Sequence, residues 1–120
     1  ILARYEATNE ACAAMVRRGA GWSAYTAFPR LPIPTLRLLC ERAGVHLYRD
    51  TEGSTAVVGA YLIIHTAEAA THRLRWPVLC KTVRRLVPEA SAPLGHNVTE
   101  WTDALPAGTT AIYHCGSAAP

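Results

Sequence analysis

One stretch of this sequence carries a helical period, and that period limits the fold more than any other feature. Apolar residues recur at helical intervals at Leu36, Leu39 and Cys40, with charged residues between them. This pattern predicts an amphipathic helix over residues 33–43, with a proline in its first turn and these three side chains turned toward a sheet. Gly44 follows in the C′ position, where a positive φ ends a helix, and is therefore expected to have a structural role.

The other apolar runs are short, β-prone and bounded by turn residues. Three precede the helix, at 1–6, 11–18 and 21–28, and seven follow it, at 45–48, 55–58, 60–65, 71–76, 81–86, 97–101 and 109–114. Pro77 is expected to stop the strand that ends at Trp76. Short strands at this spacing are typical of a small antiparallel sandwich or an open barrel.

The expected fold class is therefore α+β, with a short β-β-β-α segment followed by a small antiparallel β-sandwich. The expected organisation is a strand-rich segment with one helix over 1–43, the end of an α/β domain. An antiparallel β domain over 44–116 and a tail over 117–120 would follow it. The chain begins at Ile1 with a strand-like segment rather than with Met, so we expect another domain to precede it.

Composition excludes several classes of function. The chain has 120 residues, of which 50% are hydrophobic and 18% charged, as in a globular domain with its own core. The net charge of +3 comes from scattered arginines and forms no basic face, so a nucleic-acid partner is not expected. The apolar runs fall far short of the roughly 20 residues of a membrane helix, so a membrane partner is not expected either.

The four cysteines leave the redox state open. Cys12, Cys40, Cys80 and Cys115 form no CxxC or CxxH pair, so the sequence predicts no metal site and no cofactor. An even count permits two disulfides, but a chain of this length forms a core without them, and buried thiols are favoured. The compartment stays unknown, with the cytoplasm favoured over secretion.

A succession of packing motifs carries a resemblance to a known family. AGVHLY at 43–48 is followed by YLIIH at 61–65 and LRWP at 74–77. This succession resembles the C-terminal region of bacterial glycoside hydrolases that are β-galactosidase-like. In these enzymes a helix ending in AGVHxY enters a β domain with xLxIHxxxAG and IxLP segments.

The likeness covers roughly residues 2–114. ARY at 3–5, WSAY at 22–25 and LP at 31–32 look like the close of the amidotransferase-like domain of such enzymes. Two departures lie in the β domain: residues 69–71 lack the glycine turn of the pattern, and Trp76 replaces a smaller aliphatic residue.

The resemblance implies that this chain has a non-catalytic function. The catalytic carboxylates of such enzymes lie on a barrel domain that would precede Ile1, so no residue here inherits a catalytic role. The chain would be a non-catalytic C-terminal accessory domain of a glycoside hydrolase of carbohydrate metabolism, with a structural or oligomerisation role. Its partner would be the upstream catalytic domain of the same enzyme, and a homo-oligomer stays open. The alternatives are a free-standing carbohydrate-binding module and, third, a small independent hydrolase.

A few residues could carry chemistry or binding of their own. Glycoside hydrolysis needs two carboxylates, and Glu100 and Asp103 form the one cluster that invites attention, although a solvated turn explains it better. His46 and His65 alternate with strand hydrophobics and could approach each other, but a third metal ligand is missing, which favours structural histidines. A catalytic thiol is disfavoured because Cys115 and its neighbour His114 point to opposite faces of a strand.

Aromatic side chains offer a second kind of site. Trp76 and Trp101 lie next to predicted turns, where an exposed ring could stack on a sugar, and they are the carbohydrate-stacking candidates. The first strand and the aromatic strand near Trp22 and Tyr25 are instead expected to expose apolar surface that a preceding domain covers.

Overall fold

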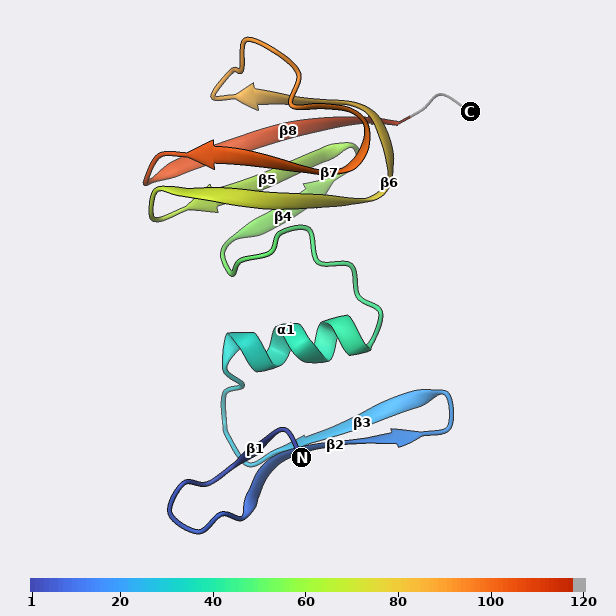
Figure 1. Cartoon of the computed structure of the whole chain (residues 1–120), viewed down its shortest axis with the longest axis vertical. Coiled ribbons are helices and arrows are strands. Elements are labelled where there is room, and N and C mark those ends of the chain that lie inside the picture. Colours follow the sequence, from blue (N-terminus) through green and yellow to red (C-terminus); the bar gives the residue numbers. More distant parts are fainter. Residues whose placement is uncertain (118–120) are drawn as a thin grey trace. The chain divides into compact units, whose positions relative to one another are not determined.

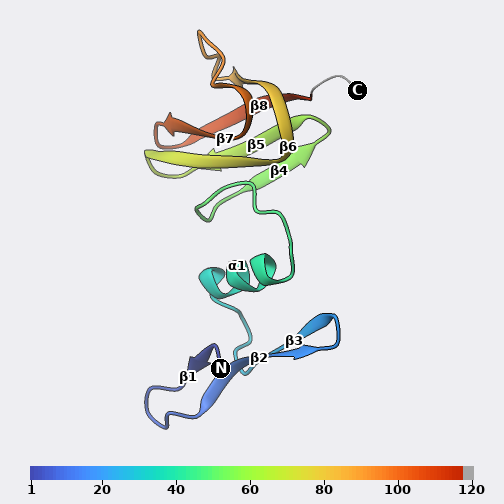
Figure 2. The ribbon, with the colours of Figure 1, turned by 45° about the vertical axis from the view of Figure 1, so that its right-hand side comes forward.

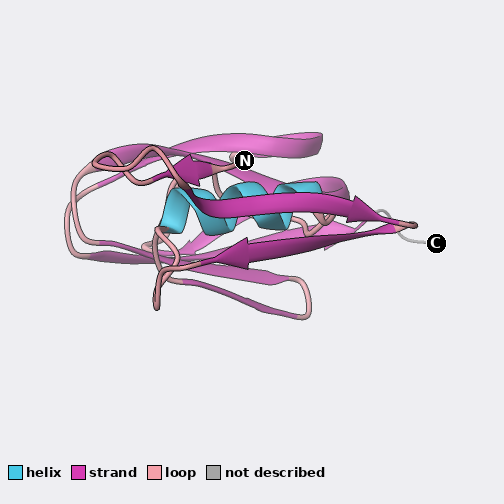
Figure 3. Ribbon diagram, turned by 90° about the horizontal axis from the view of Figure 1, so that it is seen from below, coloured by secondary structure: helices cyan, strands magenta, loops and turns pink. Residues whose placement is uncertain are grey.

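The structure is a computed structural model that describes residues 1–117 and is built mostly of antiparallel strands (Figure 1). Strands make up 56% of it and helix 9%, so the expected α+β class is wrong, although the order β-β-β-α followed by antiparallel strands agrees with the expectation. One helix occurs in these residues, α1 (Ile33–Arg42), drawn in cyan in Figure 3. The chain divides into two compact units, Ile1–His46 and a second that begins at Leu47.

The first unit contains a three-stranded sheet with the order β1-β2-β3. Its strands are β1 (Ala3–Arg4), β2 (Ala11–Arg18) and β3 (Gly21–Thr26), each antiparallel to its neighbour. The β2–β3 hairpin closes between the paired residues Arg18 and Gly21, and Gly19 takes a φ of 59° in its two-residue loop. A glycine at the first loop position suits the twist of such hairpins, because side chains rarely adopt this φ.

The first unit buries little of its apolar surface. Its buried hydrophobic residues are Cys12 and Ala13. Helix α1 has no buried residue, and Leu36 is 47% exposed, so the expectation that its apolar stripe packs on a sheet is wrong. The helix itself and the positive φ of Gly44, 75°, agree with the sequence. The helical period thus predicted the helix correctly but not the exposure of its apolar face.

Exposed aromatic side chains lie on β3 and directly after β1, as the sequence indicates. Tyr5, Trp22 and Tyr25 are all exposed, Tyr25 most of all at 64%, and Leu2 is half-buried. Val16 on β2 adds a further exposed aliphatic side chain. A unit of this size is stabilised mainly by apolar burial. The first unit buries few apolar side chains, so it has little core of its own.

The second unit is one five-stranded antiparallel sheet with the order β4-β5-β8-β6-β7. Its strands are β4 (Thr55–Val58), β5 (Tyr61–Thr66), β6 (Ala70–Val87), β7 (Gly95–Leu105) and β8 (Thr109–Ser117). No strand forms over 45–48, where the sequence predicts one, and Arg49 makes only an isolated bridge to Leu74. The tail expected over 117–120 begins on the last residue of β8, and the rest of it lies outside the described residues.

Strand β6 is the organising element of this sheet, and it corrects the expected break at Pro77. The strand is 18 residues long and continues through the proline. Its register with β7 is irregular between Arg75 and Cys80. A bulge accommodates a proline because the residues inside it are released from regular pairing. The first half of β6 pairs with β7, while the second half also pairs with β8, and the ribbon bends between them (Figure 1).

The five-stranded sheet is bent (Figure 2), and one of its faces carries the core. The core consists of Leu62, Ile64, Leu74, Trp76, Cys80, Val83, Trp101, Leu105, Ala111, Tyr113 and Cys115. These residues come from β5, β6, β7 and β8. Along β5, β7 and β8 they alternate with more exposed positions, as one buried face of a pleated strand requires, whereas in β6 the irregular register interrupts the alternation.

The opposite face of this sheet carries an apolar row. Ala56 pairs with Ile63, Ile63 with Ile112, and Ile112 with Val87, so four apolar side chains lie side by side across β4, β5, β8 and β6. Val58, 64% exposed, lies on the same face two residues from Ala56. We call these five residues the outer apolar row.

Burial predicts contrasting stability effects for two leucines. Leu62, 0% exposed in the core, should cost roughly 2–5 kcal/mol of unfolding free energy when replaced by alanine. Leu36→Ala on the uncovered helix face should cost less than about 1 kcal/mol. Urea denaturation followed by circular dichroism measures both, and equal costs would show that the helix face is covered in solution.

Candidate functional site

A polar pocket of about 480 Å³ lies within the second unit. Its walls are the loop before β4 and the turn between β5 and β6. The residues that line it are Arg49, Thr51, Glu52, Gly53, Ser54, His65, Thr66, Ala67, Glu68, Ala70 and His72. The volume is within the range of small-molecule sites, but no aromatic ring other than histidine lines the pocket.

Arg49 is 4% exposed, and its guanidinium contacts several neutral groups of this pocket. Its Nη1 donates to the carbonyl oxygens of Ser54 at 3.4 Å and His65 at 3.2 Å. Its Nη2 lies 3.3 Å from Thr51 Oγ1 and 3.3 Å from His72 Nδ1. These four contacts match the four hydrogens of the two Nη groups, so the terminal amino groups are committed to the protein.

The loop before β4 approaches this guanidinium closely. Gly53 has a φ of 144°, and a Cβ at this position would meet Arg49 Nη1 at 2.6 Å. A side chain here would displace the guanidinium in addition to straining the backbone. On the other side, the Thr66 hydroxyl donates to the carbonyl oxygen of Glu68 and shapes the turn into β6.

His72 is buried beside Arg49, and its neutral form fits the contacts. Burial, the positive charge of Arg49 and the opposing charges of Asp50 and Asp103 set its pKa, and the net result is below the ordinary value. Because Arg49 can only donate, the contact with His72 Nδ1 requires that nitrogen to accept and places the ring hydrogen on Nε2. No hydrogen-bond partner for Nε2 occurs among residues 1–117.

Sequence reasoning missed Arg49 and His72, although one signal was present for His72. In 71–76 the positions 72, 74 and 76 alternate, and Leu74 and Trp76 are apolar. That alternation places His72 on the buried face, as the structure finds. Arg49 stands in a loop without a motif, so its burial follows only from the fold.

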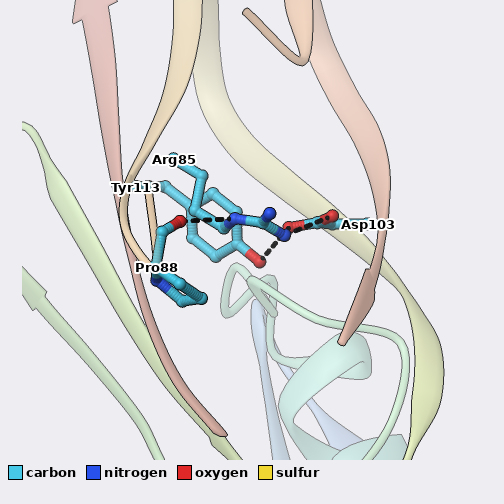
Figure 4. A network of polar contacts seen from close by, with 4 residues as sticks. All are labelled: Arg85, Pro88, Asp103 and Tyr113. Atoms are coloured by element: carbon cyan, nitrogen blue, oxygen red, sulfur yellow. Dashed lines mark hydrogen bonds and ion pairs between the residues drawn. The ribbon is translucent and has the colours of Figure 1, made fainter. Parts of the chain in front are cut away.

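A second polar cluster lies in the core and centres on Asp103 (Figure 4). Arg85 Nη1 donates to both carboxylate oxygens, at 2.9 and 2.8 Å, and the Tyr113 hydroxyl donates to Oδ2 at 2.8 Å. Arg85 Nε also donates to the carbonyl oxygen of Pro88 at 2.8 Å. Burial, then the hydrogen bond and charge of Asp103, raise the pKa of Tyr113, so its hydroxyl stays protonated.

The structure does not assemble Glu100 and Asp103 into a catalytic pair. Glu100 is held on the surface by Arg73, 2.7 Å away, and by Arg75, 3.3 Å away. The hydrogen bond from Arg73 is the largest of the influences that lower the pKa of Glu100, whereas a general acid needs a raised one. Asp103 is committed to Arg85 and Tyr113, as described above.

Both carbohydrate-stacking candidates are buried, which corrects the expectation that they lie exposed beside turns. Trp76 is 9% exposed and Trp101 4% exposed, and both belong to the core. Trp76 meets Tyr48 edge-on at 5.5 Å between ring centroids, and Trp101 lies 5.8 Å from Tyr113. Since β6 continues past Pro77, Trp76 is inside a strand rather than at its end.

The two histidines expected to be structural are not neighbours on adjacent strands. His46 lies outside any strand at the end of the first unit. His65 lies on β5, where its Nδ1 is 3.0 Å from Thr110 Oγ1 and its carbonyl oxygen accepts from Arg49. Gly44 follows α1 with the positive φ given above, which is a structural role.

The four cysteines are free thiols in this structure. Burial, together with the neighbouring Cys80, raises the pKa of Cys115 to about 12, and burial likewise raises the pKa of Cys80. Thiols with raised pKa values are poor nucleophiles. Over residues 1–117 the structure brings together no group of three or more potential metal ligands, and it contains no helix long and apolar enough to cross a membrane.

Comparison of the chain with protein-family models, with curated proteins and with solved structures finds no match. The geometry of the pocket, of the Asp103 cluster and of the outer apolar row therefore carries the functional argument.

The Asp103 cluster predicts a steep cost for removing its carboxylate. Asp103→Ala leaves the Arg85 charge, only 18% exposed, without its partner and should cost roughly 3–5 kcal/mol of unfolding free energy. Tyr113→Phe removes one hydrogen bond and should cost about 1–3 kcal/mol. Chemical denaturation measures both, and a smaller loss for Asp103→Ala than for Tyr113→Phe would contradict this assignment.

Proposed function

We propose that this chain is a non-catalytic C-terminal accessory domain of a larger glycoside hydrolase of carbohydrate metabolism. Its role is structural, and its partner is the upstream catalytic domain of the same enzyme. The observation that carries the proposal is the uncovered apolar surface of a chain whose two candidate catalytic carboxylates, Glu100 and Asp103, are held in ion pairs.

The uncovered surface has two parts, one in each unit. In the first, the aromatic side chains of β3 and the apolar side chains of α1 lie exposed. In the second, the outer apolar row spans four strands of a sheet face that an isolated antiparallel sheet normally presents as polar. Contiguous apolar surface of this kind marks an interaction site.

The acidic residues support a role without hydrolysis. A glycosidase needs one carboxyl group with a raised pKa opposite a second carboxylate. The pKa of Glu100 is lowered rather than raised, and the carboxylate of Asp103 forms an ion pair with Arg85. The pocket has Glu52 and Glu68 on its loops, where both side chains are exposed to water rather than enclosed by apolar walls.

The resemblance to β-galactosidase-like enzymes gives the larger enzyme its proposed class. It covers roughly residues 2–114 and rests on the succession AGVHLY, YLIIH and LRWP. The runner-up is a free-standing carbohydrate-binding module. Burial of Trp76 and Trp101 removes the stacking platforms on which that alternative first rested.

The first test of this proposal is enzymatic. We expect the purified chain to leave nitrophenyl galactosides and other aryl glycosides intact, because no carboxylate pair is set for acid and base roles. Release of nitrophenol followed by absorbance measures this. Turnover that disappears in Glu100→Gln, Asp103→Asn or a Glu52→Gln/Glu68→Gln double variant would overturn the proposal.

The second test concerns the uncovered surface. Without the upstream domain, the chain should self-associate through its outer apolar row, and Val58→Lys combined with Val87→Lys should shift it toward the monomer. Ala107→Lys, an exposed position in the turn before β8, is the matched control. Sedimentation velocity over a wide concentration range measures the change. If the unmodified chain is strictly monomeric, the proposal that its apolar surface contacts an upstream domain is contradicted.

A further inference from the structure

The loops above the Arg49 pocket suggest a ligand class that the accessory role does not require. We infer that this pocket binds a small, uncharged, hydroxyl-rich molecule of monosaccharide or disaccharide size, held by hydrogen bonds rather than by ring stacking. The inference concerns one site within the second unit and does not depend on the outer apolar row.

The commitments of Arg49 decide against an anion. A carboxylate, phosphate or sulfate is normally held by two parallel N–H donors of one guanidinium. In this pocket the Nη groups already contact Ser54, His65, Thr51 and His72, at 3.2–3.4 Å. An anion would have to break these contacts before it could bind the guanidinium.

Arg49 also disfavours a cationic ligand. Arg49 is buried in the pocket wall, where its positive charge is poorly screened by water. A bound ammonium group would face this charge from inside the pocket. The carboxylates of Glu52 and Glu68 sit on exposed loops, where water screens their attraction.

The groups that remain suit hydroxyls. Each carboxylate of Glu52 and Glu68 can accept hydrogen bonds from two hydroxyl groups, and the Ser54 hydroxyl can donate as well as accept. Loop residues held by a rigid scaffold commonly form such sites, and here the scaffold is the Arg49 contact set with Gly53 pressed against it. A volume of about 480 Å³ is large enough for one or two sugar rings.

The test is a titration of the isotopically labelled full chain, followed by amide chemical shifts. D-galactose, D-glucose and lactose are the neutral probes, and sodium sulfate and ethylammonium chloride are the charged ones. We expect at least one neutral probe to give saturable shifts at 51–54 and 66–70 in the millimolar range. Neither charged probe should do so.

Variants make the assignment specific to the pocket. Glu52→Gln/Glu68→Gln should weaken the neutral probe roughly tenfold or more, because hydrogen bonds to charged groups are the stronger ones. Glu89→Gln changes an exposed carboxylate outside the pocket and should leave the affinity unchanged. Unchanged peak dispersion in both variants shows that they fold.

Three outcomes overturn the inference: no saturable shift with any neutral probe, saturation by sulfate or ethylammonium at the same amides, or equal affinity in the double variant and the parent. Each is distinguishable from failure of the accessory role, which is read from aryl glycoside turnover and from sedimentation.

Discussion

The carboxylate of Asp103 connects the three strands on which the second unit depends. It lies on β7 and accepts hydrogen bonds from Arg85 on β6 and from Tyr113 on β8. A charge at this depth is tolerated because all its strong partners are in place, and because Arg85 is anchored further by the Pro88 carbonyl oxygen. This set of contacts ties the three strands together at this end of the core, in addition to the backbone pairing of β6 with β7 and with β8.

The bend in β6 gives those contacts their geometry. Without the irregular register between Arg75 and Cys80, one long strand could not pair with β7 along its first half and turn toward β8 along its second. The same bend keeps Trp76 inside the core, where it meets Tyr48, and leaves Val78 and Leu79 exposed on the bulge. A proline usually ends a strand. Pro77 instead lies where β6 changes direction.

Local signals in the sequence predicted local structure. The helix at Ile33–Arg42, the positive φ of Gly44 and strand β4 follow from period, proline and glycine positions, which depend on the nearest residues. The fold class, the burial of Trp76 and Trp101 and the uncovered face of α1 depend on contacts between distant segments, and there the sequence misled. The pocket could not be predicted for the same reason, since Arg49 and His72 are distant in sequence and lie together where the bridge between Arg49 and Leu74 joins the loop to β6.

The loop between β4 and β5 sets which side of β4 faces the core. Val58 and Tyr61 pair across a connection of only two residues, and Gly59 takes a φ of 58° within it. Because side chains alternate with a period of two, inserting a single residue into β4 would turn Ala56 and Val58 inward and Thr55 and Val57 outward. Length variation is therefore tolerated poorly at this hairpin, while the longer connection between β6 and β7 can change length without altering which residues any strand buries.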